Sequence, residues 1–104
     1  MSVILVTSTA PSQEVASKIA NQLVSKKLAA CINILPIQSV YEWKGSIETE
    51  PELKLFIKST AEQFDAISAE IKEHHPYEVP EILRLDIVDG DLAYLDWLTN
   101  TVSS

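Results

Sequence analysis

A short stretch from residue 74 to residue 81 gathers side chains that could do chemistry. It holds two imidazoles, a phenol and two carboxylates, which belong to His74, His75, Tyr77, Glu78 and Glu81. Prolines at positions 76 and 80 stiffen the backbone, because proline fixes its own φ and biases the preceding residue toward extended geometry. Titratable groups gather at functional sites, so this stretch is the first candidate. The alternative is a helix-to-strand loop in which His74 caps helix carbonyls and the carboxylates are solvated.

As metal donors, His74, His75 and Glu78 form the candidate set. Neutral imidazole is a good ligand for Cu²⁺ and Zn²⁺, and surrounding negative charge raises the local cation concentration. The side chains of adjacent histidines diverge, whereas metal motifs place their histidines at spacings such as i and i+4 on a helix. The sequence therefore predicts a weak or subunit-bridging site for copper or another divalent metal. Binding there should weaken as the pH falls through about 6, where imidazoles protonate.

A second candidate site would bind a small ligand. Its residues combine aromatic rings with charged groups and are Tyr41, Trp43, Glu48, Lys58, Tyr77 and Glu81. Tyr41 and Trp43 alternate onto one face of a strand, which makes an aromatic wall of the kind that ligand pockets use. Lys58 at a strand end could neutralise an anion or pair with Glu81. Ordinary packing at a subunit interface would use the same aromatic residues, so both interpretations stay open.

The composition narrows the class of protein. The chain has 104 residues, a hydrophobic fraction of 46% and a formal net charge of −7 at pH 7, which fit one globular domain over residues 1–104. The negative charge argues against a nucleic-acid surface or an anionic membrane surface. The single cysteine, Cys31, allows no internal disulfide and suits a reducing cytosol. Because it lies in an apolar run, we expect a buried, inert thiol.

Targeting and catalytic motifs are not evident in the sequence. The first residues carry no basic segment, and no apolar run approaches the ~20 residues needed to cross a bilayer, so we expect a cytoplasmic protein. There is no Gly-rich phosphate loop and no recognisable nucleophile motif, and only His75 with Glu81 could do acid–base work. Binding or regulation is therefore favoured over catalysis.

Hydrophobic periodicity and turn residues predict alternating strands and helices. The first expected elements are a central strand at 3–6, a capped helix at about 12–27 and a long strand at 28–43 that is bent at Pro36. A turn at 44–45 leads into a return strand at 46–48, which is interrupted by an acidic segment at 48–52 and resumes at 53–58. A helix opened by a capping box at 60–63, a strand at 82–88 and a last helix capped by Asp91 follow.

The predicted order, β-α-β-β-α-β with a terminal helix, is the split βαβ or ferredoxin-like arrangement of an α+β protein. Its two helices cover only one face of the sheet, so the apolar first strand would leave a hydrophobic face uncovered, which usually marks a partner surface. A long, bent edge hairpin also invites pairing with another chain. Both features predict a closed homo-oligomer.

Several segments together resemble one family. They are LAACIN at 28–33, SVYEWKG at 39–45, IKST at 57–60, HPYEVPEI at 75–82 and YLDW at 94–97. In this order and spacing they resemble the CutA family of small divalent-cation tolerance proteins, from about Val3 to Leu98. The resemblance implies a ferredoxin-like protomer, a tight homotrimer similar to the trimeric PII-type signalling proteins, a cytoplasmic setting, and binding of copper or other divalent metals.

One position departs from the resemblance. Some family members carry a cysteine at the end of the first strand, which is proposed to join the paired histidines in binding copper, and the matching position here is Ser8. A hydroxyl is a much poorer ligand than a thiolate for copper(I). We therefore expect a divalent-metal binding protein that serves cation tolerance and binds copper(II) modestly. The alternative is a PII-like sensor of a small anionic metabolite at the subunit interface.

Overall fold

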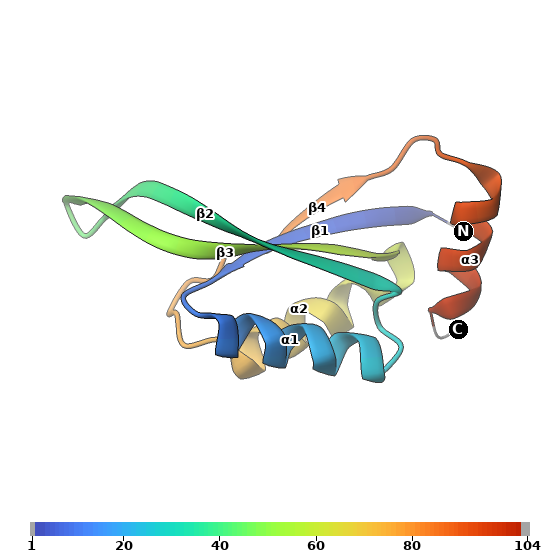
Figure 1. Cartoon of the computed structure of the whole chain (residues 1–104), viewed down its shortest axis with the longest axis horizontal. Coiled ribbons are helices and arrows are strands. Elements are labelled where there is room, and N and C mark those ends of the chain that lie inside the picture. Colours follow the sequence, from blue (N-terminus) through green and yellow to red (C-terminus); the bar gives the residue numbers. More distant parts are fainter. Residues whose placement is uncertain (1, 103–104) are drawn as a thin grey trace.

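The computed structural model describes residues 2–102, and its elements follow the expected β-α-β-β-α-β-α order (Figure 1). They are β1 (Val3–Ala10), α1 (Gln13–Ser25), β2 (Cys31–Trp43), β3 (Ser46–Thr60), the short 3-10 turn η1 (Ala61–Gln63), α2 (Phe64–His74), β4 (Leu83–Asp86) and α3 (Leu92–Thr101). The strands form one antiparallel sheet in the order β2-β3-β1-β4. The predicted α+β, ferredoxin-like fold is confirmed.

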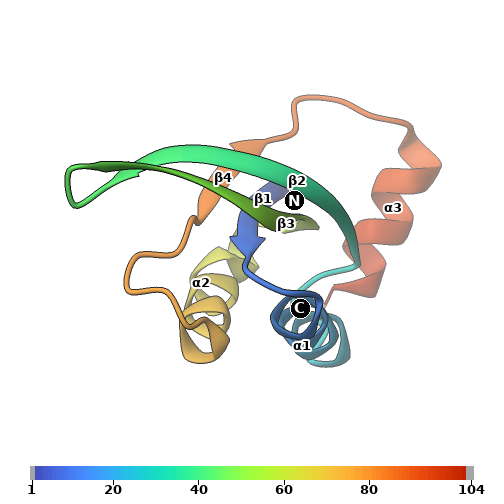
Figure 2. The same cartoon turned by 60° about the vertical axis from the view of Figure 1, so that its left-hand side comes forward.

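One face of the sheet packs on α1 and α2, which lie beneath it in both views (Figure 2). Side chains alternate along a strand, so every second residue of β1 and β3 points to this face. Its fully buried aliphatic side chains are Ile4, Val6, Leu55 and Ile57 from the strands and Ile19, Leu23, Ile67 and Ile71 from the helices. Each such side chain contributes about 1.5–3 kcal/mol by leaving water, so this layer holds the protomer together.

The helix starts follow the expected caps in two cases out of three. The Ser12 hydroxyl accepts a hydrogen bond from the Val15 amide at 3.2 Å, and the Asp91 carboxylate accepts one from the Tyr94 amide at 3.1 Å. The capping box predicted at 60–63 is wrong, because Thr60 stays in the sheet opposite Val3 and its side chain makes no cap bond. The turn η1 therefore intervenes, and α2 begins only at Phe64.

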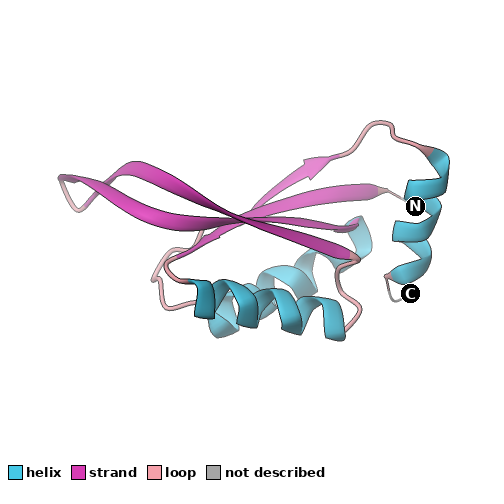
Figure 3. Ribbon diagram, in the orientation of Figure 1, coloured by secondary structure: helices cyan, strands magenta, loops and turns pink. Residues whose placement is uncertain are grey.

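The hairpin of β2 and β3 extends far beyond the helices (Figure 3). The molecule measures 44 Å along its longest axis. Lys44 and Gly45 connect the hairpin's strands with φ values of 50° and 86°, as a two-residue type I′ turn requires. The acidic interruption predicted at 48–52 is wrong, since β3 runs without a break. Pro51 is tolerated because β1 ends opposite Leu53, so this part of β3 has only β2 beside it.

The strands next to β1 also differ in length from the prediction. β1 continues to Ala10 rather than ending at residue 6, because its polar second half still pairs with β3. β4 is shorter than the predicted 82–88, since it is an edge strand that pairs only with β1, from Ile4 to Thr7.

The face of the sheet opposite α1 and α2 exposes apolar side chains. Leu83 and Leu85 of β4 lie opposite Thr7 and Leu5 on this face and remain 57% and 47% exposed, and Val88 beyond them is fully exposed. The uncovered apolar face expected from the sequence is therefore present in the protomer. Surfaces of this kind usually mark a partner site.

The last helix, α3, packs at the end of the sheet where β1 begins (Figure 1). Its Leu98 is almost fully buried and forms a second apolar cluster with Val3, Ala30 and Val102. Over residues 2–102, no helix is both long enough and apolar enough to cross a membrane.

A carboxylate between the two covering helices gives a pH-dependent prediction. Glu70 Oε1 lies 2.8 Å from Nζ of Lys26, the C-cap residue of α1, and 3.1 Å from His74 Nε2. The hydrogen bond from Lys26, helped by the one from His74, lowers the pKa of Glu70. A group with a lowered pKa stabilises the folded state above its ordinary pKa, and this contribution is lost as the pH falls through the lowered value.

We therefore expect Glu70→Gln to reduce the free energy of unfolding at about pH 7 by up to ~1 kcal/mol, since Lys26 is half exposed and its ion pair is screened. The difference from the wild type should be smaller at about pH 2 than at about pH 7, because the native carboxyl takes up its proton as the pH falls through its lowered pKa. Urea unfolding at both pH values measures it, with the exposed Glu73→Gln on the same helix as the control. A difference that stayed the same at both pH values would exclude this linkage.

Candidate functional site

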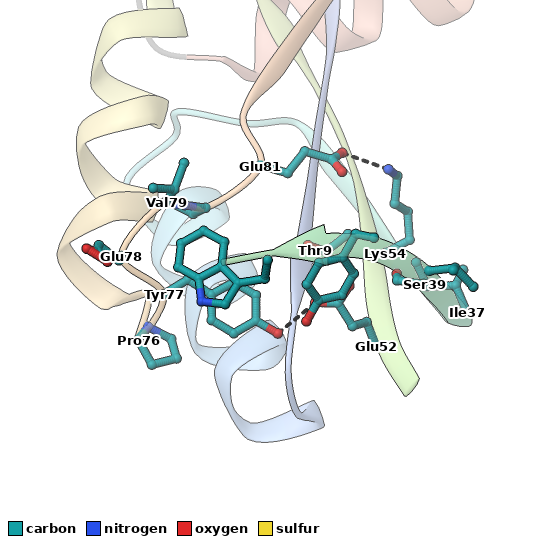
Figure 4. Close-up of a pocket in the computed structure, with 14 residues that line it drawn as sticks. Thr9, Ile37, Ser39, Glu52, Lys54, Pro76, Tyr77, Glu78, Val79 and Glu81 are labelled. Carbon is teal, nitrogen blue, oxygen red and sulfur yellow. Dashed lines mark hydrogen bonds and ion pairs between the residues drawn. The ribbon is translucent and has the colours of Figure 1, made fainter. Parts of the chain in front are cut away.

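A cavity of about 690 Å³ lies where the edge hairpin curls over the end of β1. Four segments line it, and Figure 4 shows many of their side chains pointing into the same space. The lining residues are Thr9 of β1, Ile37, Ser39, Val40, Tyr41 and Trp43 of β2, Glu52 and Lys54 of β3, and residues 76–81 of the loop after α2. Its volume is in the range of small-molecule sites, which run from about 300 to 1,000 Å³.

Strand register explains why these side chains share the cavity. Lys54 pairs with Thr9 on one side and with Leu35 on the other, and Glu52 pairs with Ile37. Directly opposed residues point to the same face of a sheet. This is the face opposite α1 and α2, because the alternate residues Leu53 and Leu55 pack on the helix-side core. The cavity is therefore built on the face that the helices leave uncovered.

The loop that closes the cavity is tied to the sheet through His75. Its Nε2 lies 2.6 Å from the carbonyl oxygen of Thr9, and its Nδ1 accepts a hydrogen bond from the Tyr77 amide at 3.1 Å. A carbonyl only accepts, so Nε2 carries the proton and the ring is the neutral Nε2–H tautomer. The ring also contacts that of Tyr77, with 4.6 Å between their centroids. Both ring nitrogens of His75 are thus used inside the protomer.

Two polar pairs cross the cavity between the loop and the strands (Figure 4). The Tyr77 hydroxyl donates to Glu52 Oε2 at 2.7 Å. Glu81 Oε2 accepts from Lys54 Nζ at 2.7 Å and from the Thr7 hydroxyl at 2.9 Å. These contacts fix the loop against β1 and β3, and they place carboxylates on both sides of the cavity.

The phenols in the cavity are held in their neutral form. Burial and then the hydrogen bond to the Glu52 carboxylate raise the pKa of Tyr77 far above its ordinary value. The pKa of Tyr41 is also raised, first by loss of solvent and then by the carboxylates of Glu50, Glu52 and Glu48. The local potential is therefore negative, which favours cations over anions.

The predicted metal donors are not gathered into one group. Within residues 2–102, no three His, Cys, Asp or Glu side chains lie close enough together to hold a metal ion. His74 pairs with Glu70, the nitrogens of His75 are occupied by Thr9 and Tyr77, and Glu78 is exposed at the cavity rim. A site built on these donors would need ligands from beyond one chain.

Neither Ser8, which stands where some family members carry a cysteine, nor the single cysteine Cys31 joins the histidines. Ser8 is fully buried on the helix-side face of β1, and its hydroxyl has no hydrogen-bond partner within the described chain. Cys31 is partly exposed rather than buried, so that expectation is wrong. It starts the edge strand β2 opposite Lys58, on the face opposite α1 and α2.

The predicted small-ligand set is partly brought together. Tyr41, Trp43, Tyr77 and Glu81 line the cavity. Glu48 lies opposite Tyr41 on the hairpin but outside the lining. Lys58 does not pair with Glu81, which is a correction: its ammonium lies 5.8 Å from the centre of the Tyr94 ring, near α3.

Two charged residues of the cavity were missed, Lys54 and Glu52. The lysine that pairs with Glu81 is Lys54, which alternation places on the same face as Lys58, four residues nearer the hairpin turn. Glu52 was assigned to an acidic break in the strand, although its position two residues before Lys54 gives it the same face. If the two-residue period of a strand had been applied to the whole of residues 46–60, both side chains would have been placed on this face.

Fold and site together define a small ferredoxin-like α+β protein whose edge hairpin and proline-stiffened loop enclose a ligand-sized cavity. The family profile described as CutA1 divalent ion tolerance protein matches residues 4–101. The chain belongs to the CutA1 family of divalent ion tolerance proteins.

Named relatives and solved structures agree with this assignment. The divalent-cation tolerance protein CutA of Thermus thermophilus is 47% identical over 91 residues, which cover 86% of this chain and 88% of that protein. Protein CutA 1, chloroplastic, of Oryza sativa is 43% identical over 99 residues, or 94% of this chain, and this chain spans 56% of its length. The structure of the periplasmic divalent cation tolerance protein CutA from Archaeoglobus fulgidus has a TM-score of 0.95 at 40% identity, covering 97% of this chain and 99% of that one. These names place relatives in different compartments, so the cytoplasmic setting of this protein stays a prediction.

Proposed function

We propose that this protein acts in divalent-cation tolerance as a homotrimeric, cytoplasmic binding protein rather than an enzyme, and that it binds copper(II) or another divalent cation weakly. Support for the cation comes from the names of its relatives, which are called divalent-cation tolerance proteins, and from its net charge of −7. Support for the trimer comes from the exposed apolar side chains of β4 and the long edge strand β2.

The observation that carries the metal proposal is the pair of His74 and Glu70. They lie one helical turn apart at the end of α2, with Nε2 of the imidazole 3.1 Å from Oε1 of the carboxylate. Within the described chain, Nδ1 of His74 makes no hydrogen bond. An imidazole and a carboxylate provide two donors, and stable zinc or copper sites use three or four. A weak site, or one completed by a neighbouring subunit, fits this donor set.

Isothermal titration with copper(II) tests the proposal and separates the two histidines. His74→Ala should lower the copper affinity by about tenfold or more. Mutating a residue that only hydrogen-bonds to a metal ligand already lowers metal affinity by about 10–100-fold. His75→Ala should change the affinity by less than about threefold, because both of its nitrogens are used inside the protomer. Binding by the wild type should weaken in acid, where protonated imidazole is no ligand.

Two results would contradict this site. Equal copper affinity in the wild type and in His74→Ala would place the metal elsewhere. A larger loss in His75→Ala than in His74→Ala, in protein shown to be folded by circular dichroism, would mean that copper displaces the bonds to Thr9 and Tyr77.

The alternative function, a PII-like sensor of an anionic metabolite, has less support from the cavity. Three carboxylates line it, from Glu52, Glu78 and Glu81, against the single ammonium of Lys54. That ammonium is already paired with Glu81. A small anion would meet an excess of negative charge within one protomer, and like charges brought together cost binding energy.

A further inference from the structure

The cavity contains a buried carboxylate without a cation. Glu52 is only 7% exposed, and the hydrogen bond that it accepts comes from the neutral Tyr77 hydroxyl at 2.7 Å. Within residues 2–102 it forms no ion pair, because the neighbouring lysine, Lys54, is paired with Glu81 (Figure 4). Burial of an ionised carboxylate is costly unless a positive charge compensates it. The protomer therefore presents an unpaired negative charge inside a ligand-sized cavity.

Aromatic rings surround the same space. Tyr41, Trp43 and Tyr77 all line the cavity, and the face of an aromatic ring attracts a cation through its quadrupole, most strongly for tryptophan. Trp43 already has one ammonium near it, since Lys44 Nζ lies 5.6 Å from the ring centroid. Aromatic rings combined with a carboxylate are the arrangement that binds substituted ammonium groups.

We propose that the cavity binds a small organic cation, whose substituted ammonium group lies among Tyr41, Trp43 and Tyr77 and pairs with the Glu52 carboxylate. This site is distinct from the proposed metal site at His74 and does not depend on it.

The lining favours an organic cation over a bare metal ion. A divalent metal needs several oxygen or nitrogen donors around one point, and no group of three suitable side chains exists in the described chain. The aromatic rings that make up much of the wall offer no such donors. An alkylated ammonium is larger and more weakly hydrated, and it gains from both the rings and the single buried carboxylate. A cavity of about 690 Å³ also exceeds what one ion would fill.

Three ligands of nearly equal shape and different charge test the proposal. They are choline, its neutral isostere 3,3-dimethylbutan-1-ol and the anion 3,3-dimethylbutanoate, each titrated calorimetrically into the full-length protein in its native assembly. We expect choline to bind at least about tenfold more tightly than the neutral alcohol. The cation–π contacts and the ion pair with the carboxylate both require the positive charge of choline, which the alcohol lacks. The carboxylate ligand should show no binding.

Two variants locate the site. Glu52→Gln removes the charge but keeps an oxygen that can accept from Tyr77, so it should weaken choline about tenfold and leave the alcohol unchanged. Trp43→Leu should weaken choline by a similar factor. The matched control is Glu42→Gln, which removes an exposed charge from the opposite side of β2, between Tyr41 and Trp43, and should change nothing. Sedimentation and thermal unfolding confirm that each variant keeps its assembly and fold.

Three outcomes would overturn the proposal. One is equal affinity for choline and the neutral alcohol, which would make the cavity a merely apolar pocket. Another is unchanged choline affinity in Glu52→Gln. The third is a lack of choline binding by the assembled wild type, which would mean that a side chain of a neighbouring subunit fills the cavity.

Discussion

Replacement of His75 by alanine should lower the free energy of unfolding by about 2–3 kcal/mol. The imidazole joins two parts of the chain that are 66 residues apart, through its bond to the Thr9 carbonyl, and it also accepts from the Tyr77 amide. Without it, the carbonyl of the buried Thr9 loses its partner, and an unsatisfied buried polar group costs about 1–3 kcal/mol. Loss of the ring contact with Tyr77 adds a smaller amount, about 0.5–1.5 kcal/mol at most.

Guanidinium unfolding at one fixed protein concentration measures this loss, since the stability of an oligomer depends on concentration. His74→Ala is the matched control, because it removes the same side chain one position earlier. It should cost less than about 1 kcal/mol, as the partner of His74 is a partly exposed carboxylate that keeps Lys26. Similar losses in both variants would show that the loop is not held by the bond from His75 to Thr9.

The contrast between the two histidines could not be predicted from the sequence. As neighbours of the same type, they have the same local signal, and both were assigned to metal. What distinguishes them is tertiary: His74 is the last residue of α2, whereas His75 is in extended geometry at its end, as expected for a residue before proline. The ring of His75 thereby reaches β1. The residue types within the segment 74–81 contain no information on that long-range contact.

The fold followed from the sequence because its signals are local and agree with one another. Apolar alternation, the caps at Ser12 and Asp91 and the Lys44-Gly45 turn each indicate the same element at the same place. The acidic segment with Pro51 failed as a strand signal because proline and glutamate are unfavourable in a central strand. That segment has only one neighbouring strand, which depends on where β1 ends and not on the segment itself.

Of the cavity, the aromatic wall could be predicted and the charge pairs could not. Tyr41 and Trp43 share a face through the two-residue period of a strand, which a sequence displays directly. Whether Glu81 meets Lys58 or Lys54 depends on where the loop after α2 crosses β3, and strand register sets that over long separations in the chain. The mistaken choice of Lys58 also suggested an anionic ligand, whereas the observed pairing leaves Glu52 unpaired and favours a cation.

The prediction with the largest expected effect concerns assembly. The wild type should sediment at micromolar concentration as three chains, or about three times 11.5 kDa. Leu85→Asp should sediment as one chain. Leu85 lies on the uncovered face opposite Leu5 and is 47% exposed in the protomer. A carboxylate buried at this surface without a partner costs several kcal/mol in each subunit, and the trimer would contain three copies of it.

The matched control for assembly is Val24→Asp, which makes the same type of change at a residue of similar exposure, 42%, on α1 in the helix layer. It should leave the trimer intact, because α1 lies beneath the sheet (Figure 2), whereas the strand register places Leu85 on the opposite face. Circular dichroism should show both variants folded, since neither residue belongs to the core cluster. A wild type that sediments as one chain would refute the trimer. A trimeric Leu85→Asp would mean that the subunits meet elsewhere than on the uncovered face of β4.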